Sequence, residues 1–244
     1  MYVDNNGLKE WRLDNSYEDY SIETYKNFGV SKDSIRYYSQ QDEDKYIIQK
    51  ILKDKITDGV FLELGACDGI MYPNTKTLED YFGFSGILIE PIGHFYNRLI
   101  SNRPNCEHHN CDVSTQEGEV TFVGSDAEGG IKEFIKNGFN KIETTVKSRQ
   151  LKNILKESQY NYIDIFILDV EGAELDVLQS IDFDEIDIYC IISEAHSDET
   201  EKNNLVISFL EGKGFQFFER QRGNNVFLRK DSNRAKYFKN NLYT

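Results

Sequence analysis

The chain has 244 residues, a length that fits one large domain or one domain with an appendage. Apolar residues make up 39% of it, enough to build a substantial core, and the formal net charge is −14. Proteins that hold a nucleic-acid backbone need a basic surface, so this charge argues against DNA, RNA or an anionic membrane surface as a partner.

The beginning of the chain is polar and acidic. Residues 1–38 show no clean hydrophobic periodicity, and we interpret them as an N-terminal extension of a domain that covers residues 39–244. The extension has no apolar signal core, and no apolar run in the chain approaches the length that crosses a membrane. Most of the four cysteines fall in predicted strands. These features predict a reduced, cytoplasmic protein.

The predicted elements alternate between helices and strands. Asp42 to Ile56 places apolar residues at helical spacing, which predicts an amphipathic helix. Short apolar runs downstream indicate buried strands, namely Val60–Leu64, Gly86–Glu90, Cys106–Val113, Ile163–Leu168 and Ile186–Ser193. Helical patterns separate most of these strands and carry Leu78, Leu99, Leu178 and Leu210. Phe215–Glu219 and Asn225–Arg229 follow as a closing hairpin through Arg222 and Gly223.

Two segments between the third and fourth of these strands have an open interpretation. Glu119 to Val123 fits an edge strand or one arm of a hairpin. Gly124 to Asn140 is rich in glycine and fits either a lid over an acceptor or an ordinary surface insertion. The remaining alternation of apolar strands and helices is typical of a parallel α/β sheet covered on both faces, to which the hairpin adds an antiparallel edge. Ligands of such sheets bind at the carboxyl ends of the strands.

A glycine turn follows the first buried strand. In VFLELGACDG, Glu63 stands near the strand end, and Gly65 and Gly69 bracket the turn. The spacing differs from the G-x-G-x-x-G of dinucleotide binders, and the turn lacks their early run of backbone N–H groups for a pyrophosphate. This difference favours a cofactor without a pyrophosphate, such as S-adenosylmethionine.

Acidic residues end the next two strands as well. Glu90 can accept hydrogen bonds from both ribose hydroxyls, and Asp112 can accept one from the adenine amino group. Together with Glu63 they would converge on one adenosine. The complete set of predicted cofactor-binding residues is Glu63, Gly65, Ala66, Asp68, Gly69, Asn74, Glu90, Pro91, Asp112, Val113 and Asp169.

Several segments resemble the FkbM family of methyltransferases over about residues 38–230. They are YSQQDEDKY, FLELGACDG, NTKTLEDYFGFSGILIEP and LDVEGAELDVL, which begin at Tyr38, Phe61, Asn74 and Leu168. The resemblance implies a Rossmann-like class I methyltransferase fold, a seven-stranded, mostly parallel sheet with an antiparallel edge strand and helices on both faces. It also implies S-adenosylmethionine as the methyl donor and O-methylation of a sugar, glycan or glycosylated metabolite. Cys67 and Pro73 depart from the Asn and Ser that are common in the family.

The residues after the fourth and fifth strands point to the acceptor. Asp169, Glu171 and Glu174 follow one strand, and Glu194 and His196 follow its neighbour. We hypothesise that Asp169 and Glu194 bracket the acceptor hydroxyl and that His196 is the general base. A divalent cation, Mg²⁺ or Mn²⁺, would take oxygen ligands from Asp169 and Glu194, with Glu171 or His196 next. The helix dipole is an alternative reason for carboxylates at the start of a helix.

Two other functions remain open at this point. A nicotinamide-dependent oxidoreductase could use a similar sheet, although the glycine spacing and the D-x-E-G-A-E segment count against it. A non-catalytic, cofactor-fold binding subunit is the second alternative, and the full set of acids at the strand ends counts against it.

Overall fold

The computed structural model describes residues 2–3, 9–10, 35–53, 56–124, 129–134, 142–196 and 199–242. Most of the predicted N-terminal extension therefore lies outside the described residues. The parts of it that are described include β1 (Tyr2–Val3) and β2 (Lys9–Glu10), which pair antiparallel. The domain boundary at residue 38 stays a prediction.

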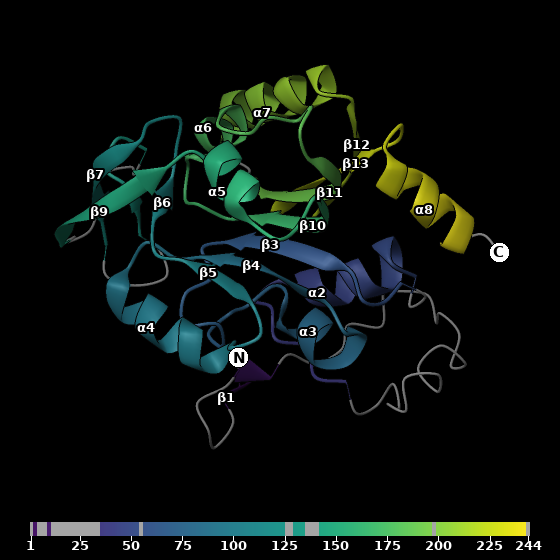
Figure 1. Ribbon diagram of the computed structural model, residues 1–244, viewed down its shortest axis with the longest axis horizontal. Helices are drawn as coiled ribbons and strands as arrows, with labels where there is room; N and C mark the ends of the chain where they lie inside the picture. Colours follow the sequence, from purple (N-terminus) through teal and green to yellow (C-terminus); the bar gives the residue numbers. More distant parts are fainter. Residues whose placement is uncertain are drawn as a thin grey trace.

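A seven-stranded sheet forms the centre of the molecule (Figure 1). Its strands, in spatial order, are β12 (Phe215–Gln221), β13 (Asn224–Arg229), β11 (Asp187–Glu194), β10 (Tyr162–Leu168), β3 (Val60–Leu64), β4 (Ser85–Ile89) and β5 (Glu107–His109). Neighbouring strands are parallel except where β13 pairs with β11 and β12. The predicted seven-stranded, mostly parallel α/β sheet is thus confirmed.

The antiparallel strand differs in place from the prediction. β13 lies between β11 and β12, one position in from the edge of the sheet. The crossover through α7 (Thr200–Gly212) leads from β11 to β12 in the same direction, with one strand's width left between them. The tight turn at Arg222 and Gly223 then folds β13 back into that gap, where its amino end meets the carboxyl end of β11.

Helices cover both faces of this sheet, as predicted (Figure 1). One face carries α2 (Glu43–Tyr46), the π-helix η2 (Ile47–Ile51), α3 (Lys76–Phe82) and α4 (Gly93–Asn102), and the other carries α5 (Leu151–Glu157), α6 (Glu174–Gln179) and α7. Successive strand residues point to opposite faces, so Phe61 packs in the first layer and Leu62 in the second. The helix predicted over Asp42 to Ile56 is shorter than expected. It is α-helical only in α2 and continues as a π-helix in η2.

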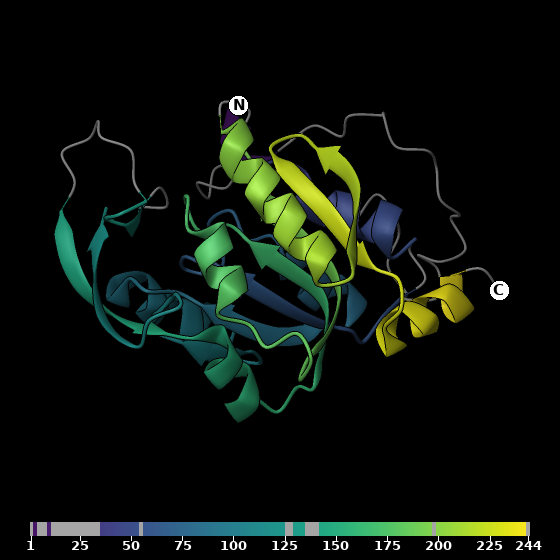
Figure 2. The same ribbon diagram turned by 90° about the horizontal axis from the view of Figure 1, so that it is seen from above.

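A second, four-stranded sheet projects from the end of the main sheet that carries β5 (Figure 2). Its order is β6 (Asp112–Val113), β9 (Glu143–Arg149), β7 (Gly118–Val123) and β8 (Gly130–Ile131). The strand predicted from Cys106 to Val113 is thus divided, because β5 stays in the main sheet while β6 leaves it to pair with β9. Part of the segment from Gly124 to Asn140 lies outside the described residues.

The C-terminal helix α8 (Asn233–Leu242) lies at the opposite end of the molecule from the second sheet (Figures 1 and 2). It packs against β11 through a stacked ring pair, Tyr189 and Phe238, with centroids 3.9 Å apart. None of the helices in the described part of the chain has both the length and the apolar character needed to cross a bilayer.

Candidate active site

A cavity of about 650 Å³ opens where the parallel strands of the main sheet end. Gly65, Glu90, Asp169 and Glu194 line it, and each follows or ends a different strand, namely β3, β4, β10 and β11. The strand order divides the cavity into two ends. Beside β4 and the second sheet the lining is largely apolar, with Ile92, Phe95, Val113, Phe122 and Ile131. Beside β10, β11 and β13 it is polar, with Glu43, Asp169, Glu171, Glu194, His196 and Asn224.

The turn after β3 requires glycine at its first position. Gly65 has a φ of 76°, and a Cβ atom there would lie 2.4 Å from the backbone oxygen of Asp169. The absence of a side chain lets the β3 turn lie directly against the end of β10. Gly69, also with a positive φ of 77°, packs against Leu99 and Arg103 of the neighbouring helix segment rather than toward the cavity.

Glu63 holds this turn from beneath. Its side chain is buried and accepts hydrogen bonds from the Asn74 backbone N–H at 2.7 Å and the Thr75 hydroxyl at 2.5 Å. The guanidinium of Arg103, fully buried, donates to the same hydroxyl at 3.1 Å. Glu63 does not line the cavity, so the predicted convergence of three strand-end acids applies to Glu90 and Asp112 only.

Some of the other predicted cofactor-binding residues line the cavity and some do not. Ala66, Asp68 and Gly69 lie outside the cavity lining, and Asp68 instead accepts hydrogen bonds from the backbone of Ile70 and Met71 within the turn. The remaining predicted residues do line the cavity, and they are Gly65, Asn74, Glu90, Pro91, Asp112, Val113 and Asp169.

Glu90 is held in place by the backbone around it. Its two carboxylate oxygens accept hydrogen bonds from the N–H groups of Cys67 at 2.9 Å and Ile92 at 2.7 Å. Burial raises the pKa of Glu90 to about 7, and these hydrogen bonds only partly oppose the effect. Cys67 has a φ of 48°, in the left-handed region that Asn tolerates better than most residues. The Asn that the family resemblance implies here would fit this conformation better than Cys does.

Asp112 lies at the junction of the main cavity and the second sheet. It accepts a hydrogen bond from the Ser148 hydroxyl on β9 at 3.1 Å, and burial raises its pKa to about 6. Phe122 and Ile131 of the same sheet face the cavity next to it. The segment around Gly124 that the sequence left open therefore supplies a wall of the cavity through Gly129, Ile131 and Phe134.

Several carboxyl groups gather at the polar end of the cavity. Burial raises the pKa of Asp169 above its usual range, and the negative charge of Glu171 raises it further. Burial also raises the pKa of Glu194, followed by the charge of Asp169. The charge of Glu174 also raises the pKa of both groups, and Glu174 itself pairs with the Lys202 ammonium at 2.7 Å, which in turn lies 2.8 Å from Glu199.

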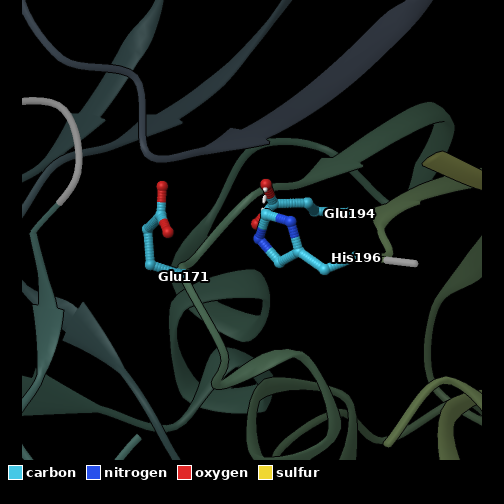
Figure 3. Close-up of side chains that lie close together, drawn as sticks. All are labelled: Glu171, Glu194 and His196. Carbon is cyan, nitrogen blue, oxygen red and sulfur yellow. Dashed lines mark ion pairs between the residues drawn. The ribbon is translucent and has the colours of Figure 1, made fainter. Parts of the chain in front are cut away.

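Glu171, Glu194 and His196 bring their side chains together at this end (Figure 3). His196 Nε2 lies 3.2 Å from Glu194 Oε1, and ligand atoms of the three residues all lie within 4.8 Å of one another. The second oxygen of Glu194 is buried and has no hydrogen-bond partner among the described residues. Asp169, a predicted metal ligand, is not part of this group, and His196 takes its place.

Glu43 and Asn224 are among the cavity residues that the sequence reasoning missed. Glu43 lies in the helix predicted from Asp42, and its Oε1 accepts a hydrogen bond from Asn224 Nδ2 at 2.9 Å. Glu43 does occur in the YSQQDEDKY segment quoted for the family resemblance, which was an available signal. Asn224 carries no such signal, because only the antiparallel pairing of β13 brings it to the carboxyl ends of the parallel strands.

A family model described as the methyltransferase FkbM domain matches residues 63–217, more than half of the chain. The chain belongs to the FkbM methyltransferase family. This assignment confirms the resemblance found in the sequence. It also confirms the prediction that the protein is an S-adenosylmethionine-dependent methyltransferase. The family match also favours this activity over the nicotinamide-dependent alternative.

Comparison with solved structures finds more distant likeness for this FkbM-family protein. Fibrillarin, a pre-rRNA processing protein of Methanococcus jannaschii, is 14% identical, with 71% of this chain and 67% of that chain covered and a TM-score of 0.43. A methyltransferase from Pyrococcus furiosus is 14% identical, with 85% and 92% covered and a TM-score of 0.43. A TehB-like SAM-dependent methyltransferase from Corynebacterium glutamicum is 10% identical, with 85% and 94% covered and a TM-score of 0.41. No curated protein matches the sequence.

Proposed function

We propose that this FkbM-family methyltransferase binds S-adenosylmethionine in the 650 Å³ cavity and methylates a hydroxyl group of a sugar, glycan or glycosylated metabolite. The observation that carries the proposal is the division of one cavity into an apolar end beside Glu90 and Asp112 and an acidic end beside Glu194 and His196. Its volume lies within the range of about 300–1,000 Å³ that is usual for small-molecule and cofactor sites.

The first end fits an adenosine group. Both oxygens of Glu90 keep a lone pair after their backbone hydrogen bonds, so the carboxylate can accept from two neighbouring ribose hydroxyls. Ile92 and Phe95, with Phe122 from the second sheet, offer apolar contact to a flat base. Asp112 stands beside them as an acceptor for an amino group.

The second end fits removal of a proton from the acceptor. When bound, S-adenosylmethionine supplies a methyl group that is already activated by its sulfonium centre. His196 takes the proton of the acceptor hydroxyl as that oxygen takes the methyl group, and Glu194, whose Oε1 lies 3.2 Å from Nε2, orients the imidazole ring. Asp169 accepts a hydrogen bond from a neighbouring hydroxyl of the acceptor and so orients the reacting one. General-base assistance of this kind contributes about 10²–10⁴-fold in rate.

Replacement of His196 tests this assignment. We expect His196→Ala to lower kcat by about a hundredfold or more, with the S-adenosylmethionine Kd measured by calorimetry within about twofold of the parent. The matched control is His94→Ala, because His94 is exposed on α4 and does not line the cavity. Parent-like turnover of His196→Ala would exclude it as the base, and absence of S-adenosylmethionine binding by the parent protein would overturn the proposal as a whole.

A divalent cation is a second candidate for the acidic end. The convergence of Glu171, Glu194 and His196 within 4.8 Å favours it, since two carboxylates and one imidazole suit Mn²⁺. The ion would act as a Lewis acid that lowers the pKa of the acceptor hydroxyl. Calorimetric titration with Mn²⁺, together with a turnover assay, distinguishes His196 as a metal ligand from His196 as the general base. Binding that is lost in Glu171→Gln supports the metal, and full turnover after EDTA treatment supports the base.

The saccharide class rests on the family resemblance and on the chemistry of the cavity. Carboxylate and amide side chains, such as Glu43, Glu171 and Asn224, are suited to hydrogen bonds with neighbouring hydroxyl groups. The net charge of −14 is unfavourable for a nucleic-acid or an anionic membrane partner. A methyl-transfer assay against mono- and oligosaccharides, followed by identification of the methylated atom by NMR, tests this part of the proposal.

A further inference from the structure

We infer that Gln41, Glu43 and Asn224 form an acceptor subsite that selects an uncharged, hydroxyl-rich sugar unit over one that bears a carboxylate or phosphate. The inference rests on the proposed function and names a subsite for its acceptor. All three residues lie outside the stretch 63–217 that the family model matches. They line the same cavity as the matched residues.

The pairing of β13 with β11 sets the location of the subsite. Asn224 stands opposite Glu194 in the antiparallel register, and the Ala195 backbone N–H donates to the Gly223 oxygen at 2.7 Å. Because β4 lies on the other side of β3 and β10, Asn224 is on the far side of Glu194 from Glu90. A group held by Asn224 would therefore extend away from the adenosine end, beyond the reacting hydroxyl.

Hydrogen bonds fasten the chain before α2 onto the β12–β13 turn. Gln41 Oε1 accepts from the Gly223 N–H at 3.1 Å, and the Gln41 backbone oxygen accepts from Gln221 Nε2 at 3.1 Å. Glu43 accepts from Asn224 Nδ2 at 2.9 Å and from the Gln41 N–H at 2.8 Å. Glu43 is only 7% exposed, so its carboxylate is held in one position at the cavity wall. Such buried and satisfied networks are preorganised for binding.

The charges around this subsite define the chemistry of its ligand. Asp169, Glu171 and Glu194 lie at the same end of the cavity as Glu43, and Lys202 is already paired with Glu174 and Glu199. An acidic group on the acceptor would meet carboxylates with no unpaired cationic side chain in the described lining to balance it. Sugar hydroxyls can instead donate hydrogen bonds to Glu43 and accept them from an amide.

The test measures binding without turnover. The complex of the 244-residue chain with S-adenosylhomocysteine is titrated with methyl hexosides of gluco, galacto and manno configuration and with the matching uronic acids. We expect the parent to bind at least one hexoside about tenfold or more tightly than its uronic acid. Glu43→Gln replaces the acidic group by an amide with little change in shape, and it should reduce that ratio by about fivefold or more.

Controls separate this inference from the proposed function. Glu211→Gln removes an exposed carboxylate on α7 and should leave the ratio unchanged. Asn224→Ala should weaken hexoside binding without changing S-adenosylhomocysteine affinity, which also reports that each variant is folded. An unchanged ratio in Glu43→Gln, equal binding of the uronic acid by the parent, or binding of no sugar in the set overturns the subsite. Loss of cofactor binding by the parent overturns the proposed function instead.

Discussion

Several carboxyl groups of the cavity are buried, and they lack the water that stabilises the charge of an exposed carboxylate. Glu90 shows the consequence most clearly, because burial raises its pKa to about 7 even though two backbone N–H groups donate to it. A proton on this carboxyl would block one of the oxygens proposed to accept a ribose hydroxyl. Proton binding and cofactor binding therefore compete at this side chain.

The affinity for S-adenosylmethionine should accordingly depend on pH. The folded pKa of Glu90 is raised, so the ionised form is lost as the pH falls through about 7, and we expect the Kd to rise by up to about tenfold per pH unit below that value. Calorimetry between pH 8 and about pH 5.5 measures this slope. Glu90→Gln should bind weakly and lose the part of the slope that begins near pH 7, while the titration of Asp112 near pH 6 remains, whereas a parent Kd independent of pH would remove Glu90 from the cofactor site.

Among the elements, the turn between β3 and the following helix is fixed by close backbone contact. Gly65 approaches the Asp169 oxygen, and Glu63 holds Asn74 and Thr75 from the buried side. The turn thus links the proposed cofactor end to the proposed acceptor end through Asp169. A small shift of this turn would disturb both ends together.

Substitution of Gly65 tests this coupling. Gly65→Ala combines a left-handed backbone with a Cβ atom 2.4 Å from the Asp169 oxygen, and we expect a loss of about 2 kcal/mol or more in the free energy of unfolding, together with loss of cofactor binding. Gly93→Ala is the matched control, because a Cβ there meets nothing within 4 Å at the start of α4. Urea unfolding of both proteins gives the comparison, and equal stability would contradict the role given to Gly65.

In the molecule as a whole, a buried ion pair attaches α8 to the main sheet. The Asp164 carboxylate, with no exposed surface, pairs with Arg234 Nε at 2.6 Å and accepts from the Val60 N–H at 2.9 Å. The Arg234 guanidinium also lies over the rings of Tyr162 and Tyr237. The last helix is therefore joined to β10 and β3, two central strands that are distant from it in sequence.

Removal of Arg234 should destabilise the whole domain. Arg234→Met leaves the Asp164 carboxylate buried without its cation, a change that typically costs about 3–5 kcal/mol. Lys239→Met, an exposed change on the same helix, should stay within about 0.5 kcal/mol of the parent. Denaturant unfolding followed by circular dichroism measures both values. A similar small effect of the two substitutions would show that the pair contributes little.

Much of the fold and the family could be determined from the sequence. The apolar runs that became β3, β4, β10 and β11 are buried on both faces, which makes parallel strands easy to recognise by composition alone. The carboxylates that follow such strands, such as Glu90 and Asp169, must lie at one edge of the sheet, because parallel strands all end there. Four segments, the one with D-x-E-G-A-E among the most specific, then predicted the FkbM family, which the family model confirms.

Only the tertiary structure decided what each side chain faces. Glu63 lies within β3, opposite Leu88, and its side chain is buried under the glycine turn, whereas Glu90 follows the end of β4 and lines the cavity. Asn224 reaches the cavity because β13 enters the sheet in the reverse direction, and Glu43 meets it across 181 positions of the chain. Strand periodicity specifies local conformation, but the direction of a strand and the partner of a side chain depend on packing between segments that are distant in sequence.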